Sequence, residues 1–277
     1  MIQYGRQEIT DEDIKAVVKV LHSDFLTQGP AVPIFEKKLC DYTGSRYAVA
    51  VNNCTSALHI ACLALGLGQG DILWTSPITF VASASCAIYC GASIDFVDIE
   101  IDTALMSVEK LKEKLKLAEK EGKLPKIVIP VHFAGQPCDM EEIYTLSQQY
   151  NFRIIEDAAH AFGSEYNGRK IGSFGDVACF SFDGIKNITC GEGGCIVTND
   201  KNILQKVRDS RLLGVERDTE KRYSGERSWG FDVGAQGWRY HMSNIMAAIG
   251  VEQLERFPEL SNKRKQLVKL YDELLAG

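Results

Sequence analysis

A lysine among small and apolar residues is the first feature of this sequence that could carry chemistry. Lys186 lies in the run FSFDGIKNITCGEGG, which spans residues 180–194. A lysine amine with a lowered pKa can attack an aldehyde and form a Schiff base. A single lysine is more often a solvated residue in a turn, so the segment by itself is compatible with both interpretations.

Acidic residues at the end of an apolar strand are the second feature. In the run IIEDAAH, the apolar residues lead into Glu156, Asp157 and His160. A carboxylate such as Asp157 can pair with a protonated ring nitrogen and keep it charged. The same aspartate could instead only cap the next helix, and a lone histidine is more often a core or capping residue than a catalyst.

Two further segments could bind an anion. Residues 53–57, NCTSA, follow a β-branched run and open a predicted helix. Hydroxyls and free N–H groups at a helix N-terminus suit a phosphate, although a plain helix cap gives the same pattern. Residues 237–244, GWRYHMSN, could deliver Arg239 or His241 to a neighbouring anion, or could be a loop capped by Ser243.

Alternating strands and helices must position these residues. Apolar and β-branched runs predict strands over residues 47–51, 72–74, 94–97, 126–131, 153–155 and 177–182. Helical periodicity predicts helices over residues 56–65, 107–120, 140–150 and 245–254, and a final helix from about Leu260. This order predicts a mostly parallel sheet with helices on both faces, which binds ligands at the carboxyl ends of its strands.

Composition excludes several classes of function. The 277 residues are 45% apolar and 25% charged, with a formal net charge of -6, which gives no indication of a nucleic acid or an anionic membrane as partner. No apolar run approaches the roughly 20 residues of a membrane span, and the N-terminus has no secretory pattern. The nine cysteines include no CxxC pair. We therefore expect reduced thiols, no metal site and a cytoplasmic protein.

Taken in order, the four segments resemble the sugar aminotransferases of the DegT/DnrJ/EryC1/StrS family, a branch of the aspartate-aminotransferase fold. The resemblance covers essentially the whole chain. It implies a three-layer α/β fold with a mostly parallel sheet, and pyridoxal 5′-phosphate as cofactor. It also implies a large cofactor-binding domain over residues 1–255. Residues 256–277 would begin a linker helix towards a small C-terminal domain that this chain lacks.

The roles of single residues follow from matching the motifs of that family. Lys186 would form the Schiff base, Asp157 would pair with the pyridine nitrogen, and His160 would lie close to the phenolic oxygen. Phe80, in the run TSPITF, would cover the ring. The residues expected to hold the cofactor phosphate are Thr55, Ser56, Ala57, Ser181 and Arg239.

The resemblance implies transfer of an amino group from an amino acid, L-glutamate in this family, to the C4 ketone of a nucleotide-linked 4-keto-6-deoxy sugar. Such products serve the synthesis of surface polysaccharides or glycans, and the enzymes are homodimers with shared active sites. The first half is most similar to the branch that aminates UDP-linked N-acetylhexosamines for pseudaminic acid. Asp183 and Arg239 depart from that branch, which usually has His and Asn there. A nucleotide-sugar dehydratase of the same fold, with His in place of Lys186, and an inactive fragment are the alternatives.

Overall fold

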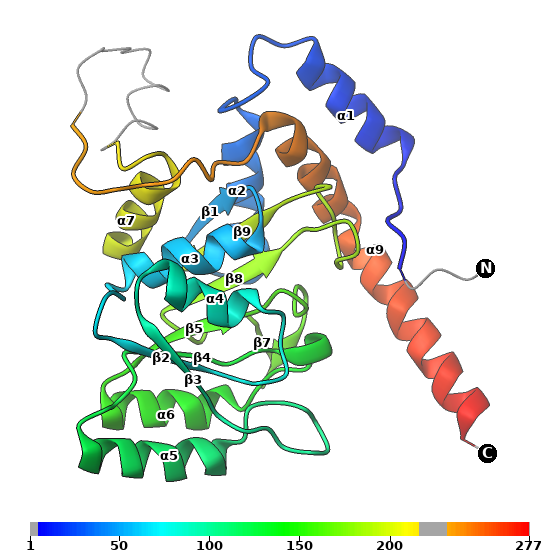
Figure 1. Ribbon diagram of the computed structural model, residues 1–277. Coiled ribbons are helices and arrows are strands. Elements are labelled where there is room, and N and C mark those ends of the chain that lie inside the picture. Colours follow the sequence, from blue (N-terminus) through cyan, green and yellow to red (C-terminus); the bar gives the residue numbers. More distant parts are fainter. Residues whose placement is uncertain (1–4, 216–231, 277) are drawn as a thin grey trace.

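The computed structural model describes residues 5–215 and 232–276, and a seven-stranded sheet lies at its centre (Figure 1). In their order across the sheet the strands are β1 (Tyr47–Val51), β9 (Gly194–Thr198), β8 (Val177–Ser181), β5 (Arg153–Asp157), β4 (Ile127–Ile129), β2 (Ile72–Thr75) and β3 (Ser93–Phe96). Strand β9 pairs antiparallel with β1 and β8, and all other neighbours in this sheet pair in parallel. The predicted mostly parallel sheet is confirmed, and the parallel strands all end at one edge.

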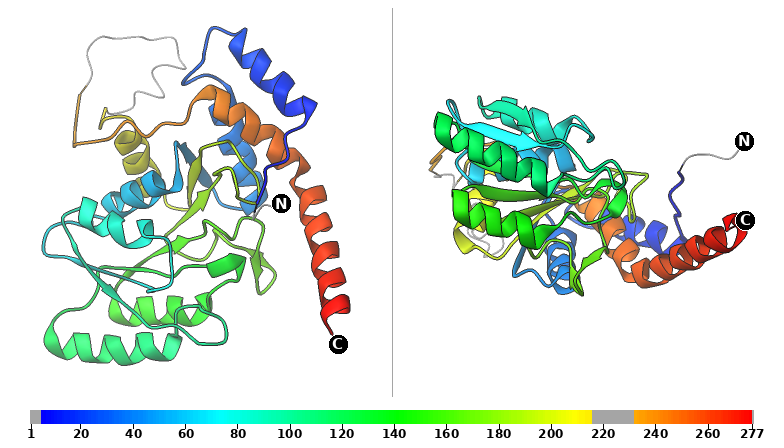
Figure 2. Two further views of the ribbon diagram at one scale, coloured as in Figure 1. Left: turned by 45° about the vertical axis from the view of Figure 1, so that its right-hand side comes forward. Right: turned by 90° about the horizontal axis from the view of Figure 1, so that it is seen from below.

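Helices cover both faces of the sheet and form the predicted three layers (Figure 2). One face carries α3 (Cys54–Ala64), α4 (Ala82–Tyr89) and α7 (Lys201–Arg211). The other face carries α2 (Ala31–Thr43), α5 (Val108–Glu121), α6 (Met140–Tyr150) and α9 (Asn244–Leu275). Alternate strand residues serve the two faces, as in β1, where Val49 enters the first core and Ala50 the second. No helix among the described residues is long and apolar enough to cross a membrane.

Two strands of the main sheet differ most from the sequence prediction. Strand β4 ends at Ile129, whereas the prediction ran to residue 131, because Pro130 has no N–H to donate to the ladder. Strand β9 was not predicted, since glycines precede its short apolar run. Gly194 starts this strand beside Asn53, and a Cβ at Gly194 would lie 2.5 Å from the carbonyl carbon of Asn53. Only glycine therefore allows β9 to pass so close to the start of α3.

The C-terminal helix also differs, because the pattern predicted a break between Leu254 and Leu260. Helix α9 instead continues through Pro258. Proline lacks the N–H for one helical bond and crowds the preceding turn. Helix α2 packs on α9 before the proline, and beyond it Arg264 Nη2 donates to the carbonyl oxygen of Asn187 at 2.9 Å. These tertiary contacts hold the helix on both sides of Pro258.

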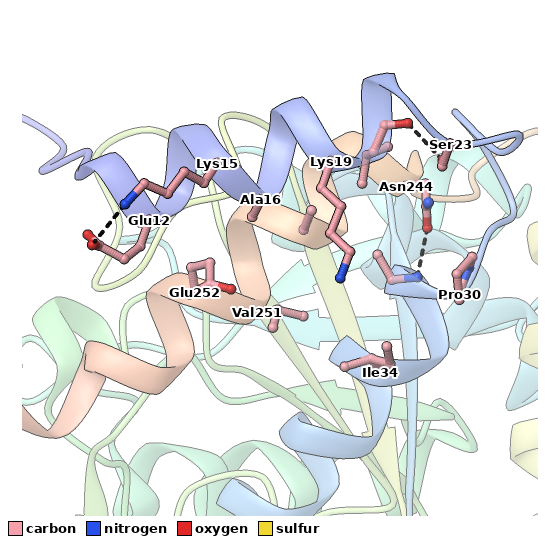
Figure 3. Close-up of a pocket in the computed structure, with 13 residues that line it drawn as sticks. Glu12, Lys15, Ala16, Lys19, Ser23, Pro30, Ile34, Asn244, Val251 and Glu252 are labelled. Carbon is pink, nitrogen blue, oxygen red and sulfur yellow. Dashed lines mark hydrogen bonds and ion pairs between the residues drawn. The ribbon is translucent and has the colours of Figure 1, made fainter.

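Helix α1 (Asp11–Leu21) lies across the first part of α9 and leaves a groove of about 430 Å³ between α1, α2 and α9 (Figure 3). Ala16, Ile34 and Val251 line it, one from each helix. Asn244 Oδ1 accepts a hydrogen bond from Ala31 N at 2.8 Å, which ties the start of α9 to the start of α2. The remaining strands form a small hairpin, β6 (Glu165–Tyr166) and β7 (Arg169–Lys170).

Candidate active site

A cavity of about 480 Å³ opens at the carboxyl edge of the sheet. Its walls include Asn53 after β1, Phe80 after β2, Asp157 at the end of β5 and Ser181 at the end of β8. Because these strands are parallel, distant parts of the chain meet at this edge, which is where such sheets bind ligands. The groove of Figure 3 is lined by none of the predicted site residues.

Six of the nine predicted site residues line this one cavity. They are Thr55, Phe80, Asp157, His160, Ser181 and Lys186. Ser56 and Ala57 are 5% and 0% exposed and lie behind the lining, in the first turn of α3. Arg239 is exposed and is not part of the lining. The fold therefore brings the lysine, the aspartate and the histidine together and leaves the arginine outside.

The N-terminus of α3 borders the cavity and supplies backbone donors. Asn53 caps the helix, because its Oδ1 accepts from Ser56 N at 2.8 Å and its carbonyl oxygen accepts from Ala57 N at 3.2 Å. The N–H groups of Cys54 and Thr55 remain without a bond to any described residue. Free N–H groups at a helix N-terminus, together with the hydroxyl of Thr55, suit an anion.

The carboxylate of Asp157 is held on both of its oxygens. Ser83 Oγ donates to Asp157 Oδ2 at 2.5 Å, and Ala159 N donates to Oδ1 at 3.1 Å. The backbone N–H of Asp157 donates to the carbonyl oxygen of Pro130 at 3.0 Å, and the residue is 5% exposed. A fixed, nearly buried carboxylate at the edge of a cavity is suited to bind a cationic donor such as a protonated ring nitrogen.

Hydrogen bonds on both sides of Lys186 fix the loop that carries it. Phe182 N donates to the carbonyl oxygen of Gly193 at 2.8 Å and closes the loop at its base. Asn187 Nδ2 donates to the carbonyl oxygen of Phe162 at 2.8 Å. Lys186 itself is half-buried and lines the cavity. A lysine held in this way has the fixed position that Schiff-base chemistry needs.

His160 is a neutral hydrogen-bond donor in this site. Ala134 N donates to His160 Nδ1 at 3.3 Å, so the ring proton is on Nε2. Burial lowers the pKa of His160, the positive charge of Lys186 lowers it further, and the carboxylate of Asp157 raises it. The net shift is downward. The ring is therefore uncharged at neutral pH and can donate one hydrogen bond through Nε2.

A buried acid lies behind the end of β5, next to Asp157 in sequence but outside the lining of the cavity. Glu156 is 0% exposed; its Oε1 accepts from Gly175 N at 2.7 Å and from Phe174 N at 3.2 Å. Its Oε2 lies 3.1 Å from His132 Nε2. Cys138 N donates to His132 Nδ1 at 3.1 Å, so Nε2 carries the proton that faces Glu156. Glu156 therefore links the end of β5 to the backbone at Phe174 and Gly175 and to His132, next to the cavity.

Arg239 lies on an extended segment whose neighbours pack on α3. The Trp238 ring centroid lies 4.5 Å from that of His59, and the Tyr240 hydroxyl lies 3.2 Å from His59 Nδ1. Residue 239 itself forms an antiparallel bridge with Leu212. Alternate residues of an extended chain point to opposite sides, so Arg239 points away from α3.

Three residues whose hydrogen bonds hold the site together were not predicted as site residues from the sequence, namely Asn53, Ser83 and Asn187. Asn53 lay in the segment 53–57, for which a helix cap was one of the two interpretations, but it was not named as a site residue. The roles of Ser83 and Asn187 have no local signal. Ser83 meets Asp157 across 74 positions of the chain, and Asn187 meets Phe162 across 25. Both contacts depend on how the elements pack.

Comparison with known proteins gives consistent matches along the chain. A sequence model of the DegT/DnrJ/EryC1/StrS aminotransferase family matches residues 7–277. The UDP-4-amino-4,6-dideoxy-N-acetyl-beta-L-altrosamine transaminase of Campylobacter jejuni is 37% identical over 273 residues, 99% of this chain and 69% of that protein. The spore coat polysaccharide biosynthesis protein SpsC of Bacillus subtilis is 37% identical over 270 residues, 98% of this chain and 68% of that protein. Among solved structures, Helicobacter pylori PseC, an aminotransferase involved in the biosynthesis of pseudoaminic acid, has a TM-score of 0.89 at 30% identity, and the match covers 98% of this chain and 70% of PseC.

Proposed function

Because the chain belongs to the DegT/DnrJ/EryC1/StrS aminotransferase family, we propose that it moves an amino group from an amino acid to the C4 ketone of a nucleotide-linked 4-keto-6-deoxy sugar. The proposed cofactor is pyridoxal 5′-phosphate. One observation carries the proposal: a single cavity combines a lysine amine, a fixed carboxylate and a helix N-terminus with available N–H groups. These groups match the aldehyde, the ring nitrogen and the phosphate of that cofactor.

The residues around the cavity fit the parts of the cofactor. The phosphate would bind the N–H groups at the start of α3 and the hydroxyls of Thr55 and Ser181. Ser56 and Ala57 would support that turn from behind. Phe80 is 72% exposed at the cavity, which leaves its ring available to cover the pyridine ring. The cavity volume lies in the range that small-molecule sites occupy, roughly 300–1,000 Å³.

When bound, pyridoxal phosphate supplies an electron sink for the negative charge that develops at the α-carbon of the amino acid. Lys186 Nζ holds the cofactor covalently at rest. Its free amine would also be placed to move a proton between the donor α-carbon and carbon C4′ of the cofactor, as base and then acid. Asp157 would keep the ring nitrogen protonated, and His160 would be able to donate a hydrogen bond from Nε2 to the phenolic oxygen. Lys186 would perform the reverse proton transfer when the sugar ketone is aminated.

The proposed donor is L-glutamate, as in the family, and the proposed products serve surface polysaccharide or glycan synthesis. A dehydratase of the same fold would have histidine where Lys186 stands, so the lysine favours aminotransfer. The test is to titrate the purified chain with pyridoxal phosphate and record its absorbance spectrum. We expect a band at the edge of the visible range that L-glutamate removes and a nucleotide-linked keto sugar restores. Absence of the band, or restoration by simple keto acids alone, would contradict the proposal.

A UDP-linked 4-keto-6-deoxy-N-acetylhexosamine is the proposed sugar. The runs LTQG and TSPITFVASA of the first half support it, as does the 37% identity to the Campylobacter jejuni transaminase. We expect kcat/KM with L-glutamate to be at least about a hundredfold higher for this sugar than for dTDP- or GDP-linked 4-keto-6-deoxyhexoses, because a site that hydrogen-bonds an N-acetyl group rejects analogues without one. Steady-state kinetics with the three sugars measure this ratio. Faster amination of a dTDP or GDP sugar would overturn this assignment and leave aminotransfer to a keto sugar intact.

We further propose a homodimer in which Arg239 reaches the cofactor phosphate of the partner. Its exposure outside its own cavity supports this arrangement. Mixing Lys186→Ala with Arg239→Ala, each inactive alone, should restore about a quarter of the parental activity, since half of the mixed dimers are heterodimers with one intact site of two. Mixing Lys186→Ala with Asp157→Asn should give no activity above that of Asp157→Asn alone, because both residues serve the same chain's cavity. No recovery in the first mixture, once subunit exchange is demonstrated, would place Arg239 in its own chain's site.

The proposed domain division places residues 1–255 in the cofactor-binding domain and residues 256–277 in a helix that leads to a small C-terminal domain. Helix α9 crosses this boundary without interruption. Beyond the boundary, Leu270, Tyr271 and Leu274 are 48%, 64% and 72% exposed. Such an exposed apolar face supports the proposal that an apolar surface of the small C-terminal domain packs against them. The proposed location is the cytoplasm, a reducing compartment that suits the nine free cysteines.

A further inference from the structure

A buried serine beside Asp157 has a chain of hydrogen bonds that leads into the site. Ser83, on α4, is 0% exposed. Its Oγ lies 2.5 Å from Asp157 Oδ2, 2.7 Å from Thr79 Oγ1 and 3.2 Å from the carbonyl oxygen of Phe80. A hydroxyl has one proton, and bonds to a charged acceptor are the shortest and strongest. Ser83 therefore donates to Asp157, and Thr79 donates to Ser83.

The apolar surroundings of Ser83 mean that its hydroxyl needs a hydrogen-bond partner. Its neighbours on the buried side of α4 are Ala82, Ala84, Cys86 and Ala87, all apolar and buried. A hydroxyl in such surroundings is costly unless it is bonded. The carboxylate of Asp157 accepts the hydrogen bond of the Ser83 hydroxyl and so offsets the cost of burying it.

We propose that Ser83 is a positioning residue that orients the Asp157 carboxylate towards the ring nitrogen of the cofactor, with Thr79 fixing the direction of the Ser83 hydroxyl. This inference rests on the proposed function. Ala159 N occupies Oδ1, so removal of the Ser83 hydroxyl leaves Oδ2 without a donor among the described residues and leaves the carboxylate free to rotate. A rotated carboxylate would form a weaker hydrogen bond to the protonated ring nitrogen, and the cofactor would bind more weakly.

The test compares two cofactors that differ at the ring nitrogen. Pyridoxal phosphate and its 1-deaza analogue, in which C–H replaces the nitrogen, are titrated into the full chain and into Ser83→Ala, Ser83→Thr and Ser85→Ala. We expect Ser83→Ala to raise the Kd of pyridoxal phosphate roughly tenfold or more and to leave the Kd of the analogue unchanged. Ser83→Thr should restore the parental preference because it keeps the hydroxyl. Ser85→Ala should match the parent, since among the described residues the Ser85 hydroxyl bonds to the carbonyl oxygen of Val81, the N-cap of the same helix, at 2.8 Å.

Each other outcome contradicts the proposal in a recognisable way. Equal weakening of both cofactors in Ser83→Ala would mean that the serine has a packing role only. An unchanged preference in Ser83→Ala would show that Asp157 needs no support from it, while the proposed function stands. If the parent binds neither cofactor, the proposed function and this inference fall together. If the parent binds both equally, the inference alone is contradicted, because the ring nitrogen then contributes nothing to binding. If Ser83→Ala does not fold, Thr79→Val replaces it, and we then expect a smaller loss in the same direction.

Discussion

Replacing Lys186 with alanine is expected to abolish covalent attachment of pyridoxal phosphate and to remove aminotransferase activity. Lys186 is the one lysine among the described residues that line the cavity. Loss of its amine removes the nucleophile that holds the cofactor and the group that moves the proton. General acid–base catalysis by a positioned side chain is worth about 10²- to 10⁴-fold, so the rate should fall by at least that factor.

Borohydride reduction followed by peptide mapping gives a direct measurement. In the parent protein we expect the reduced cofactor on the peptide that contains Lys186, and in Lys186→Ala we expect no label. Lys170→Ala is the matched control, because Lys170 lines a different cavity and is paired with Glu165 at 2.7 Å. Label on another lysine of the parent would show that Lys186 is not the attachment site.

Asp157→Asn is expected to slow the half-reaction with L-glutamate at least tenfold while the protein stays folded. Asparagine has nearly the same shape but no charge, so the ring nitrogen would lose the partner that keeps it protonated. A hydrogen bond to a charged group contributes about 1.5–3 kcal/mol to stability, and each 1.4 kcal/mol in a barrier is about a factor of ten in rate. Single-turnover absorbance measurements on cofactor-saturated protein report this step without interference from cofactor loss.

Glu156→Gln is the matched comparison, since it makes the same change at the neighbouring residue. Glu156 accepts hydrogen bonds from two backbone N–H groups through Oε1 and from His132 through Oε2. Glutamine can keep only one of these two sets, because one of its two terminal atoms is a donor. We expect a loss of about 1–3 kcal/mol of stability and a lower Tm, with a near-parental rate per folded, cofactor-loaded molecule. Similar and mild rate effects of the two substitutions would argue against the assigned role of Asp157.

Much of the sheet could be predicted from local pattern. Strand β1 and helix α6 have the predicted bounds, and the other predicted strands agree within a few residues. Strand β9 and the continuity of α9 were not predictable. The glycines at the start of β9 carry no strand signal. The need for glycine becomes clear only in the structure, where Gly194 passes too close to Asn53 for a side chain. Pro258 by itself indicates a helix end, whereas α9 continues through it, with α2 packed on it before the proline and the Arg264 hydrogen bond beyond it.

The sequence by itself determined where most strands end to within a few residues, and therefore that Asp157 and Ser181 lie at or near the carboxyl edge of the sheet. It also placed Lys186 in the loop that follows β8, since strand periodicity and glycine-rich turns are local properties of the chain. The tertiary structure alone decided which side chains share the cavity and which hydrogen bonds hold them. Ser83 reaches Asp157 because α4 packs beside the end of β5, and Arg239 stays outside because Trp238 and Tyr240 pack on His59. Such contacts join residues far apart in the chain, and their geometry depends on strand order and helix packing, which no local pattern contains.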